Sequence, residues 1–257
     1  MELQNLKNYF LGRFEKKELR TFLLVQLSVI WLLILIAYLL YPPSEYSIMR
    51  HTFSYLGSQD AHNNPEGWYW FSIALIAMGI LMIPLILYRH RRLSKIDPNM
   101  ARFNTLLLII GAIGIFLLAF FPDDGRDFME DLSYGRIHNQ LAVVAFAGLG
   151  LGNIFDSFIF LKDRWPKWPL GGGGTKILNH KKLQIPVIGL FIVVFCTAFF
   201  LIRWEIIYPE IHAQNPEIGS WPGEGIYSFP LWEWIVIVYL FIYITATMLI
   251  YPNKIEE

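Results

Sequence analysis

The side chains in this sequence that are best suited to chemistry are polar groups that lie beside long apolar segments. The candidates for holding a ligand are Arg50, His51, Ser54, His62, Asp123, Asp124, His138 and Glu233. Such groups donate and accept hydrogen bonds, and the imidazoles and carboxylates among them can also transfer protons or bind a metal. Which chemistry they perform depends on the segments that bring them together.

Residues 50–68 carry the densest run of these groups. Within this run, Asn64, Pro65 and Glu66 are typical of a helix start, because Asn caps, Pro fits the first turn and Glu complements the helix dipole. A helix start does not account for the other polar residues of the run. These are Arg50, His51, Ser54 and His62.

Asp123 and Asp124 follow directly after an apolar segment. Paired acids in that position suit a bound cation or an ordered water, and they equally suit a plain solvated turn. Together with Asp60 and the histidines they supply enough ligands for a hydrolytic zinc site. However, no His-x-x-x-His or comparable spacing is present. We therefore predict no cofactor and keep a zinc ion as the alternative.

Glu233 lies between two tryptophans, one turn inside the last apolar segment. An unpaired carboxylate would be unfavourable at that depth. We expect it either to be a partner of the helix N-terminus or to pair with an arginine. The arginine candidates are Arg50, Arg126, Arg136 and Arg203.

The apolar segments themselves predict a membrane protein. The chain is 55% hydrophobic and only 16% charged, and its apolar residues are gathered into blocks of about 20, the length that a helix needs to cross a bilayer. We predict an all-α, polytopic bundle of six transmembrane helices that forms a single integral membrane domain over residues 1–257. The predicted spans are 21–41, 68–88, 104–121, 139–161, 183–202 and 230–251.

The basic residues predict the orientation of these spans. Of the Lys and Arg residues, 17 fall in the termini and the even-numbered connections, and 4 fall in the other three connections. The positive-inside rule therefore predicts cytoplasmic N- and C-termini in a multi-pass protein of the cell membrane. The opposite surface carries twelve acids and four of the six histidines. Membrane lipids are the expected partners, and zero net charge gives no reason to expect nucleic acid.

The fourth span carries an interior stripe that runs from His138 to Asp156. Ala142, Gly152 and other residues on the same line are mostly small, which lets a neighbouring helix approach closely. An ionisable group that faced lipid would be costly, so the stripe should face the bundle. Two simpler interpretations stay open: Asp156 could reach cytoplasmic water, and His138 could merely cap its helix.

Short motifs add a resemblance to a known family. The run from Arg50 to Gly57, the Asn64-Pro65-Glu66-Gly67-Trp68 segment, Phe121-Pro122-Asp123 and His138 resemble the bacterial and archaeal "domain of unknown function 998" family. The Ser-x-x-Gly and Pro-Glu motifs, His138 and Glu233-Trp234 are also similar to Frag/DRAM/Sfk-type six-helix membrane proteins. The resemblance covers roughly Tyr41 to Tyr251. It implies a six-helix fold and a lipid context, because the Frag-type proteins are linked to glycolipid-anchor remodelling and lipid homeostasis.

Two functions follow as hypotheses. The first is a binder whose outward-facing polar pocket holds a lipid headgroup or a small polar ligand. The second is a lipid hydrolase or acyl-remodelling enzyme, with His138 as the base or a metal ligand and the Asp123–Asp124 pair assisting. A transporter is a third possibility, but apart from Asp156 the predicted spans contain few ionisable groups. The oligomeric state and the identity of the ligand are not predicted.

Overall fold

The structure is a computed structural model that describes residues 8–42, 46–59, 64–129, 132–164, 178, 180–203 and 227–251. Within these residues, six helices are long and apolar enough to cross a membrane. They are α2 (Lys16–Leu39), α3 (Trp68–Leu93), α4 (Pro98–Leu118), α5 (Tyr134–Arg164), α6 (His180–Ile202) and α8 (Phe229–Ile250). The predicted all-α, multi-pass membrane fold is therefore confirmed, and each helix overlaps one predicted span.

The helix ends differ from the predicted ones, because apolar length reports the membrane and not the full helix. α3 continues to Leu93 rather than ending at Tyr88, and α5 begins at Tyr134 rather than Asn139. Charged and polar residues continue these helices beyond their apolar segments. Asp97 marks the start of α4, since its side chain accepts hydrogen bonds from the second and third backbone amides that follow.

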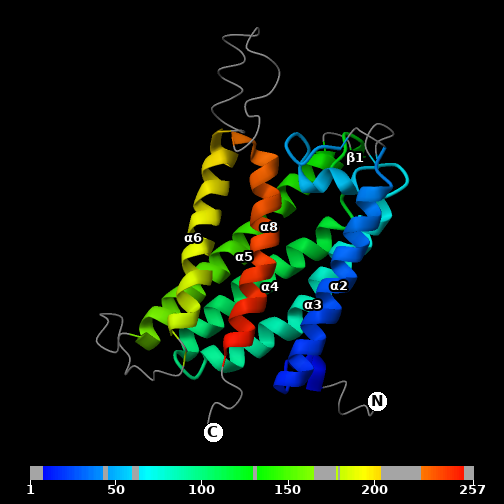
Figure 1. The fold of residues 1–257 in the computed structure, drawn as a ribbon. Coiled ribbons are helices and arrows are strands. Elements are labelled where there is room, and N and C mark those ends of the chain that lie inside the picture. Colours follow the sequence, from blue (N-terminus) through cyan, green and yellow to red (C-terminus); the bar gives the residue numbers. More distant parts are fainter. Residues whose placement is uncertain are drawn as a thin grey trace.

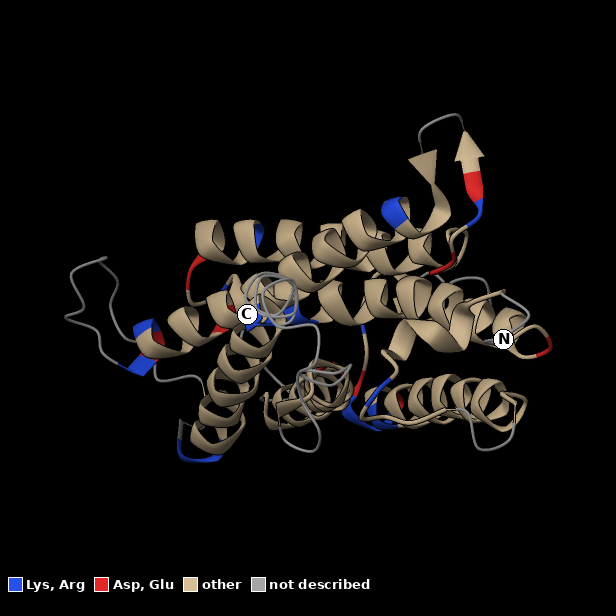
Figure 2. Ribbon diagram, turned by 90° about the horizontal axis from the view of Figure 1, so that it is seen from above, with Lys and Arg blue, Asp and Glu red and all other residues tan. Residues whose placement is uncertain are grey.

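The helices pack mainly in sequence order, as Figure 1 shows. α2 lies against α3, α3 against α4 and α4 against α5, while α6 pairs with α8. The short 3-10 helix η1 (Phe53–Gly57) and the hairpin of β1 (Asp127–Met129) and β2 (Leu132–Ser133) lie at one end of the bundle. α2 begins and α8 ends at the opposite end. In Figure 2 the helices are tan over most of their length, and charged segments lie mainly at helix ends and in connections.

The backbones of α4 and α5 approach each other closely, and glycine makes this possible. A Cβ atom on Gly111 would lie 2.7 Å from the amide nitrogen of Leu149, and one on Gly148 would lie 2.6 Å from the amide nitrogen of Gly111. No larger residue fits between backbones at this separation. The predicted interior stripe of α5 faces the bundle, as expected. Its buried members are His138, Ala145, Leu149, Gly152 and Asp156.

Asn64 caps the turn that leads into α3 and also connects three elements. α3 begins at Trp68, as the predicted span does, and residues 65–67 form the turn before it. The buried Asn64 side chain donates to the carbonyl oxygens of Ala37 (3.0 Å) and Leu56 (2.8 Å). Its own oxygen accepts from the amide of Gly67 at 3.1 Å. The asparagine thereby ties η1 to the end of α2 and the start of α3, which places η1 over the bundle.

Candidate functional site

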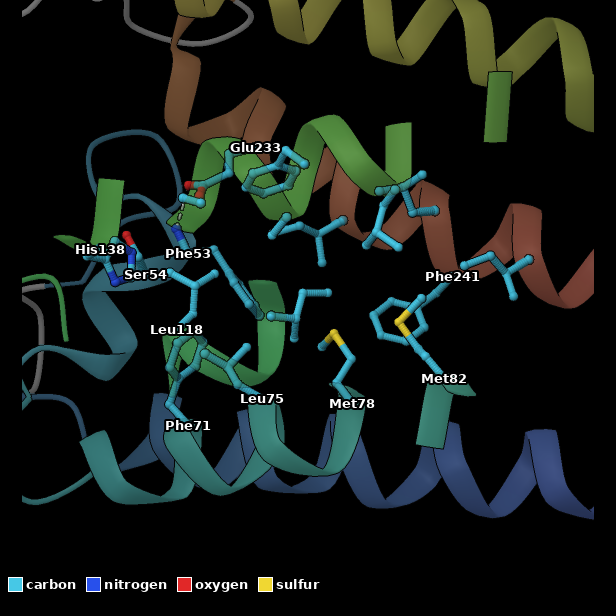
Figure 3. A pocket seen from close by; sticks show the side chains of 18 residues that line it. Phe53, Ser54, Phe71, Leu75, Met78, Met82, Leu118, His138, Glu233 and Phe241 are labelled. Carbon is cyan, nitrogen blue, oxygen red and sulfur yellow. Dashed lines mark hydrogen bonds between the residues drawn. The ribbon is translucent and has the colours of Figure 1, made fainter. Parts of the chain in front are cut away.

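A cavity of about 80 Å³ lies inside the bundle, below η1 and between α3, α4, α5 and α8. We call it the outer pocket; Figure 3 shows it from close by. Its polar lining residues are Ser54, His138 and Glu233. Every other lining residue is apolar: Phe53, Phe71, Leu75, Met78, Met82, Ile115, Leu118, Ala142, Ala145, Phe146, Leu149, Ile237, Leu240, Phe241 and Ile244.

The outer pocket is long and narrow. On α8 its lining extends from Glu233 to Ile244, which spans ~16 Å at 1.5 Å per helical residue. A volume of about 80 Å³ spread over such a length leaves room for a chain rather than for a ring system or a globular solute. The three polar residues gather at one end, and Met82 and Phe241 lie toward the other (Figure 3).

Glu233 is held by the start of η1. Its side chain is 8% exposed, and its Oε2 accepts a hydrogen bond of 2.8 Å from the backbone amide of Phe53. The first amides of a helix have no partner inside that helix, so a carboxylate satisfies one of them well. Among the described residues Oε1 has no protein hydrogen bond, so it is available to a ligand. The expected pairing of Glu233 with an arginine is therefore wrong.

His138 lies in the second turn of α5 and is 5% exposed. Its Nδ1 is 2.7 Å from the carbonyl oxygen of Phe121. A carbonyl oxygen can only accept, so Nδ1 carries the proton of this hydrogen bond. In the neutral imidazole the lone pair is then on Nε2, which is an acceptor or a base. The simpler interpretation of His138 as a helix cap is wrong, because α5 begins four residues earlier, at Tyr134.

Ser54 is held from behind by an acidic group. Its hydroxyl donates to Oδ2 of Asp123 at 2.9 Å, and its oxygen lies 2.8 Å from the hydroxyl oxygen of Thr52. Since a serine hydroxyl has one hydrogen, Thr52 is the donor in the second contact. Burial and, next, the charge of Asp123 raise the pKa of the neighbouring Tyr55. The polar end of the pocket is thus an acidic region.

The structure separates the other predicted site residues from the pocket. Asp124 is buried and binds the guanidinium group of Arg126 through two hydrogen bonds of 2.7 and 3.0 Å. Nδ1 of His51 accepts from the amide of Ser47 at 3.0 Å, so this ring stabilises its own turn. Arg50 is exposed and does not line the pocket, and His62 lies outside the described residues. Of the described candidates within residues 50–68, Ser54 alone lines the pocket together with His138 and Glu233.

A metal site does not emerge within the described part of the chain. There, no three His, Cys, Asp or Glu side chains gather closely enough to hold an ion. Among the zinc candidates, Asp124 is engaged by Arg126 and Asp123 by Ser54. Asp60 and His62 lie outside the described residues.

A buried ion pair lies deeper in the bundle, and the sequence interpretation missed half of it. Arg89 follows the predicted span 68–88 and so falls in a predicted basic connection, yet it lies inside α3, is 2% exposed and pairs with the fully buried Asp156 of α5. Asn104 also donates to Asp156, and Arg89 donates to Asn153 at 2.8 Å. Asp156 therefore does not reach water. The need for a countercharge opposite Asp156 was the signal that pointed to a basic residue on a neighbouring helix.

Comparison with known proteins gives a family match. A family described as "Protein of unknown function (DUF998)" matches residues 27–249, which include the residues that line the outer pocket, all of α3 to α6, and parts of α2 and α8. No curated protein and no solved structure matches the chain.

Proposed function

The chain belongs to the DUF998 family of proteins of unknown function, and we propose that it binds a single-chain amphiphile in the outer pocket. The polar head of the ligand would contact Ser54, His138 and Glu233, and its alkyl chain would lie along the apolar part of the pocket. The observation that carries this proposal is the division of one narrow cavity into a polar end and an apolar remainder. Ligand sites commonly combine an apolar lining with a few fixed polar groups in this way.

The charges around the polar end favour a head that donates hydrogen bonds. Glu233 lines the pocket and Asp123 lies directly behind Ser54. None of the described residues that line the pocket is Lys or Arg. A phosphate would meet carboxyl groups with no countercharge, whereas an ammonium or a hydroxyl group would donate to them. The proposed ligand class is therefore a long-chain amine or alcohol rather than an anionic lipid.

The proposal also includes the orientation of the protein in the membrane, because this decides which side the polar end of the pocket faces. The excess of Lys and Arg in the termini and even-numbered connections supports cytoplasmic termini in the cell membrane. Because η1 lies at the end opposite to the start of α2 and the end of α8, the polar end of the pocket would then face outward. A ligand would enter from the outer leaflet.

Ligand binding can be tested with defined probes in lipid nanodiscs. Dodecylamine and dodecanol, each at the same mole fraction in the bilayer, should raise the thermal unfolding midpoint, and dodecyl phosphate should not. Glu233→Gln should weaken the effect of the amine most, since it removes the carboxylate. Asp127→Asn, an exposed acid outside the pocket, should behave as the unchanged protein.

A variant that fills the pocket separates specific binding from partitioning into the bilayer. Ala142 lines the pocket and is half-buried, so Ala142→Phe should occupy the space of the ligand. We expect this variant to keep its unfolding midpoint without probe and to lose the response to amine and alcohol. Stabilisation by dodecyl phosphate above dodecylamine, or no response to any probe, would contradict the proposal.

The lipid hydrolase is the second candidate. It is favoured by Ser54, whose hydroxyl donates to the Asp123 carboxylate in the pocket that His138 also lines. A serine hydroxyl held by an acceptor and an imidazole that lines the same pocket are groups that an esterase uses. Turnover of a fluorogenic long-chain ester by the purified protein, lost in both Ser54→Ala and His138→Ala, would establish this function. Binding of the amine without ester turnover would support the binding function and exclude the hydrolase.

A further inference from the structure

A second cavity lies beyond the far end of the outer pocket. Its volume is about 20 Å³, and we call it the inner cavity. Three residues, Met82, Phe241 and Ile244, line both spaces. They therefore form the partition between them. In Figure 3, Met82 and Phe241 lie at the end of the outer pocket away from His138 and Glu233.

The inner cavity has an apolar lining interrupted by polar side chains. It is lined by Arg89, which belongs to the buried ion pair, and by Gln26, which is 3% exposed. Within the described part of the chain, Nε of Arg89 and Oε1 of Gln26 are buried without a hydrogen-bond partner. An alkyl chain pushed past the partition would lie against these groups and keep water from them. That contact is unfavourable, because unpaired polar groups in an apolar setting carry a large desolvation cost.

The two side chains of the partition named in Figure 3 differ in freedom. The ring of Phe241 packs edge-on against Trp31 of α2, with 5.6 Å between ring centroids. This contact with a neighbouring helix holds the Phe241 ring in place. Met82 is buried, but its unbranched side chain can adopt several conformations. Phe241 is thus the rigid part of the partition, and Met82 is the adaptable part.

We infer that Met82 and Phe241 set the maximum length of the alkyl chain that the outer pocket accepts. This inference rests on the proposed function, since it concerns the same pocket and the same ligand. An alkyl chain that is short enough to end before the partition only exchanges one apolar environment for another when it leaves the bilayer for the pocket. Added methylenes beyond that length must displace Met82 or reach the inner cavity.

The experiment is a competition among primary n-alkylamines from hexyl to octadecyl in nanodiscs, against labelled dodecylamine. Affinity expressed per mole fraction in the bilayer should stay nearly level with length and then fall by roughly tenfold, as when a packed core is overfilled. Met82→Ala and Phe241→Leu should each move that fall to longer chains. Phe241→Leu keeps an apolar side chain of useful size in case removal of the ring alters folding.

Met78→Ala is the matched control, because Met78 lines the same pocket on α3 but is not part of the partition. It should leave the length limit in place. The inference fails, while the proposed binding function stands, if amines bind but Met82→Ala and Phe241→Leu keep the same maximum chain length. It also fails if Met78→Ala changes the maximum chain length by as much. If no amine of any length competes, the proposed function fails together with the inference.

Discussion

At the scale of single residues, backbone groups position the polar end of the outer pocket. The amide of Phe53 holds one oxygen of Glu233, and the carbonyl oxygen of Phe121 holds one nitrogen of His138. Each side chain thus uses one polar atom for positioning and keeps a second for a ligand. A group fixed in this way loses little conformational freedom on binding, which favours affinity.

The buried ion pair allows a sharp prediction at this scale. Asp156→Ala leaves the Arg89 guanidinium buried without its countercharge, so the protein should lose about 3 kcal/mol or more of unfolding free energy. The double variant Arg89→Met with Asp156→Leu should recover most of that loss, because it removes both charges together. Thermal or denaturant unfolding in detergent measures both. If the double variant is as unstable as Asp156→Ala, the unpaired charge of Arg89 does not cause the loss of stability.

At the scale of elements, Asp97 links two helices where α4 begins. Its carboxylate accepts from the amides of Asn99 and Met100, both at 3.0 Å, and pairs with Lys162 near the end of α5. Burial acts to raise the pKa of Asp97, but the hydrogen bonds from Lys162 and the two amides outweigh it. The pKa therefore lies below its ordinary value of 3.8.

This lowered pKa gives a pH dependence of stability with a definite sign. Because the folded pKa lies below the unfolded one, Asp97 contributes stability above the unfolded value, and that contribution is lost as the pH falls through the folded value. Asp97→Asn can still accept the capping hydrogen bonds, so it should lower the unfolding midpoint at neutral pH and narrow the gap to the unchanged protein below about pH 4. If the two proteins differ in unfolding midpoint by the same amount at neutral pH and at acidic pH, the lowered pKa of Asp97 is not the cause of the difference.

The crossing of α4 and α5 depends on close backbone contact, because the lipid supplies no hydrophobic force that would bring the two helices together. Lipid tails are as apolar as leucine, so helices associate in the membrane through close packing. Gly148 and Gly150 lie two residues apart on α5 but face different surroundings. A Cβ on Gly148 would collide with Gly111, whereas one on Gly150 would meet nothing within 4 Å.

Leucine at these two positions should therefore have opposite outcomes. Gly148→Leu should separate α4 from α5 and cost about 1–3 kcal/mol or more, as overpacking does in a core. Gly150→Leu should leave the yield of folded protein and its unfolding midpoint near those of the unchanged chain. Size-exclusion profiles and unfolding midpoints in detergent test the pair. Similar losses in both variants would place the helix crossing elsewhere on α5.

At the scale of the whole molecule, the ends of the bundle differ in charge and structure. The end with η1 and the hairpin belongs to the side with four Lys and Arg residues and twelve acids in the sequence. The opposite end has the basic connections. The proposed orientation puts the polar end of the pocket outside, and it can be tested without knowing the ligand.

Single cysteines in a Cys196→Ser background test this orientation. Gly125 lies before β1 and Lys95 lies between α3 and α4, and both are exposed in the structure. Gly125→Cys should react with a membrane-impermeant maleimide in intact cells, and Lys95→Cys should react only after the cells are opened. Labelling of Lys95→Cys in intact cells would reverse the orientation and turn the polar end of the pocket to the cytoplasm.

Membrane class, helix number and the interior face of α5 were predictable from the sequence alone, because each depends on neighbours along the chain. The length of an apolar segment sets whether it spans, and the period of a helix sets which residues share a face. The pairings of Glu233 with Phe53 and of Arg89 with Asp156 join residues far apart in the chain. Only the packing of α3, α5, α8 and η1 decides such contacts. It also decided that Ser54 lines the pocket while His51 and Arg50 do not, since Ser54 belongs to η1 over the bundle and the other two lie in the turn before η1.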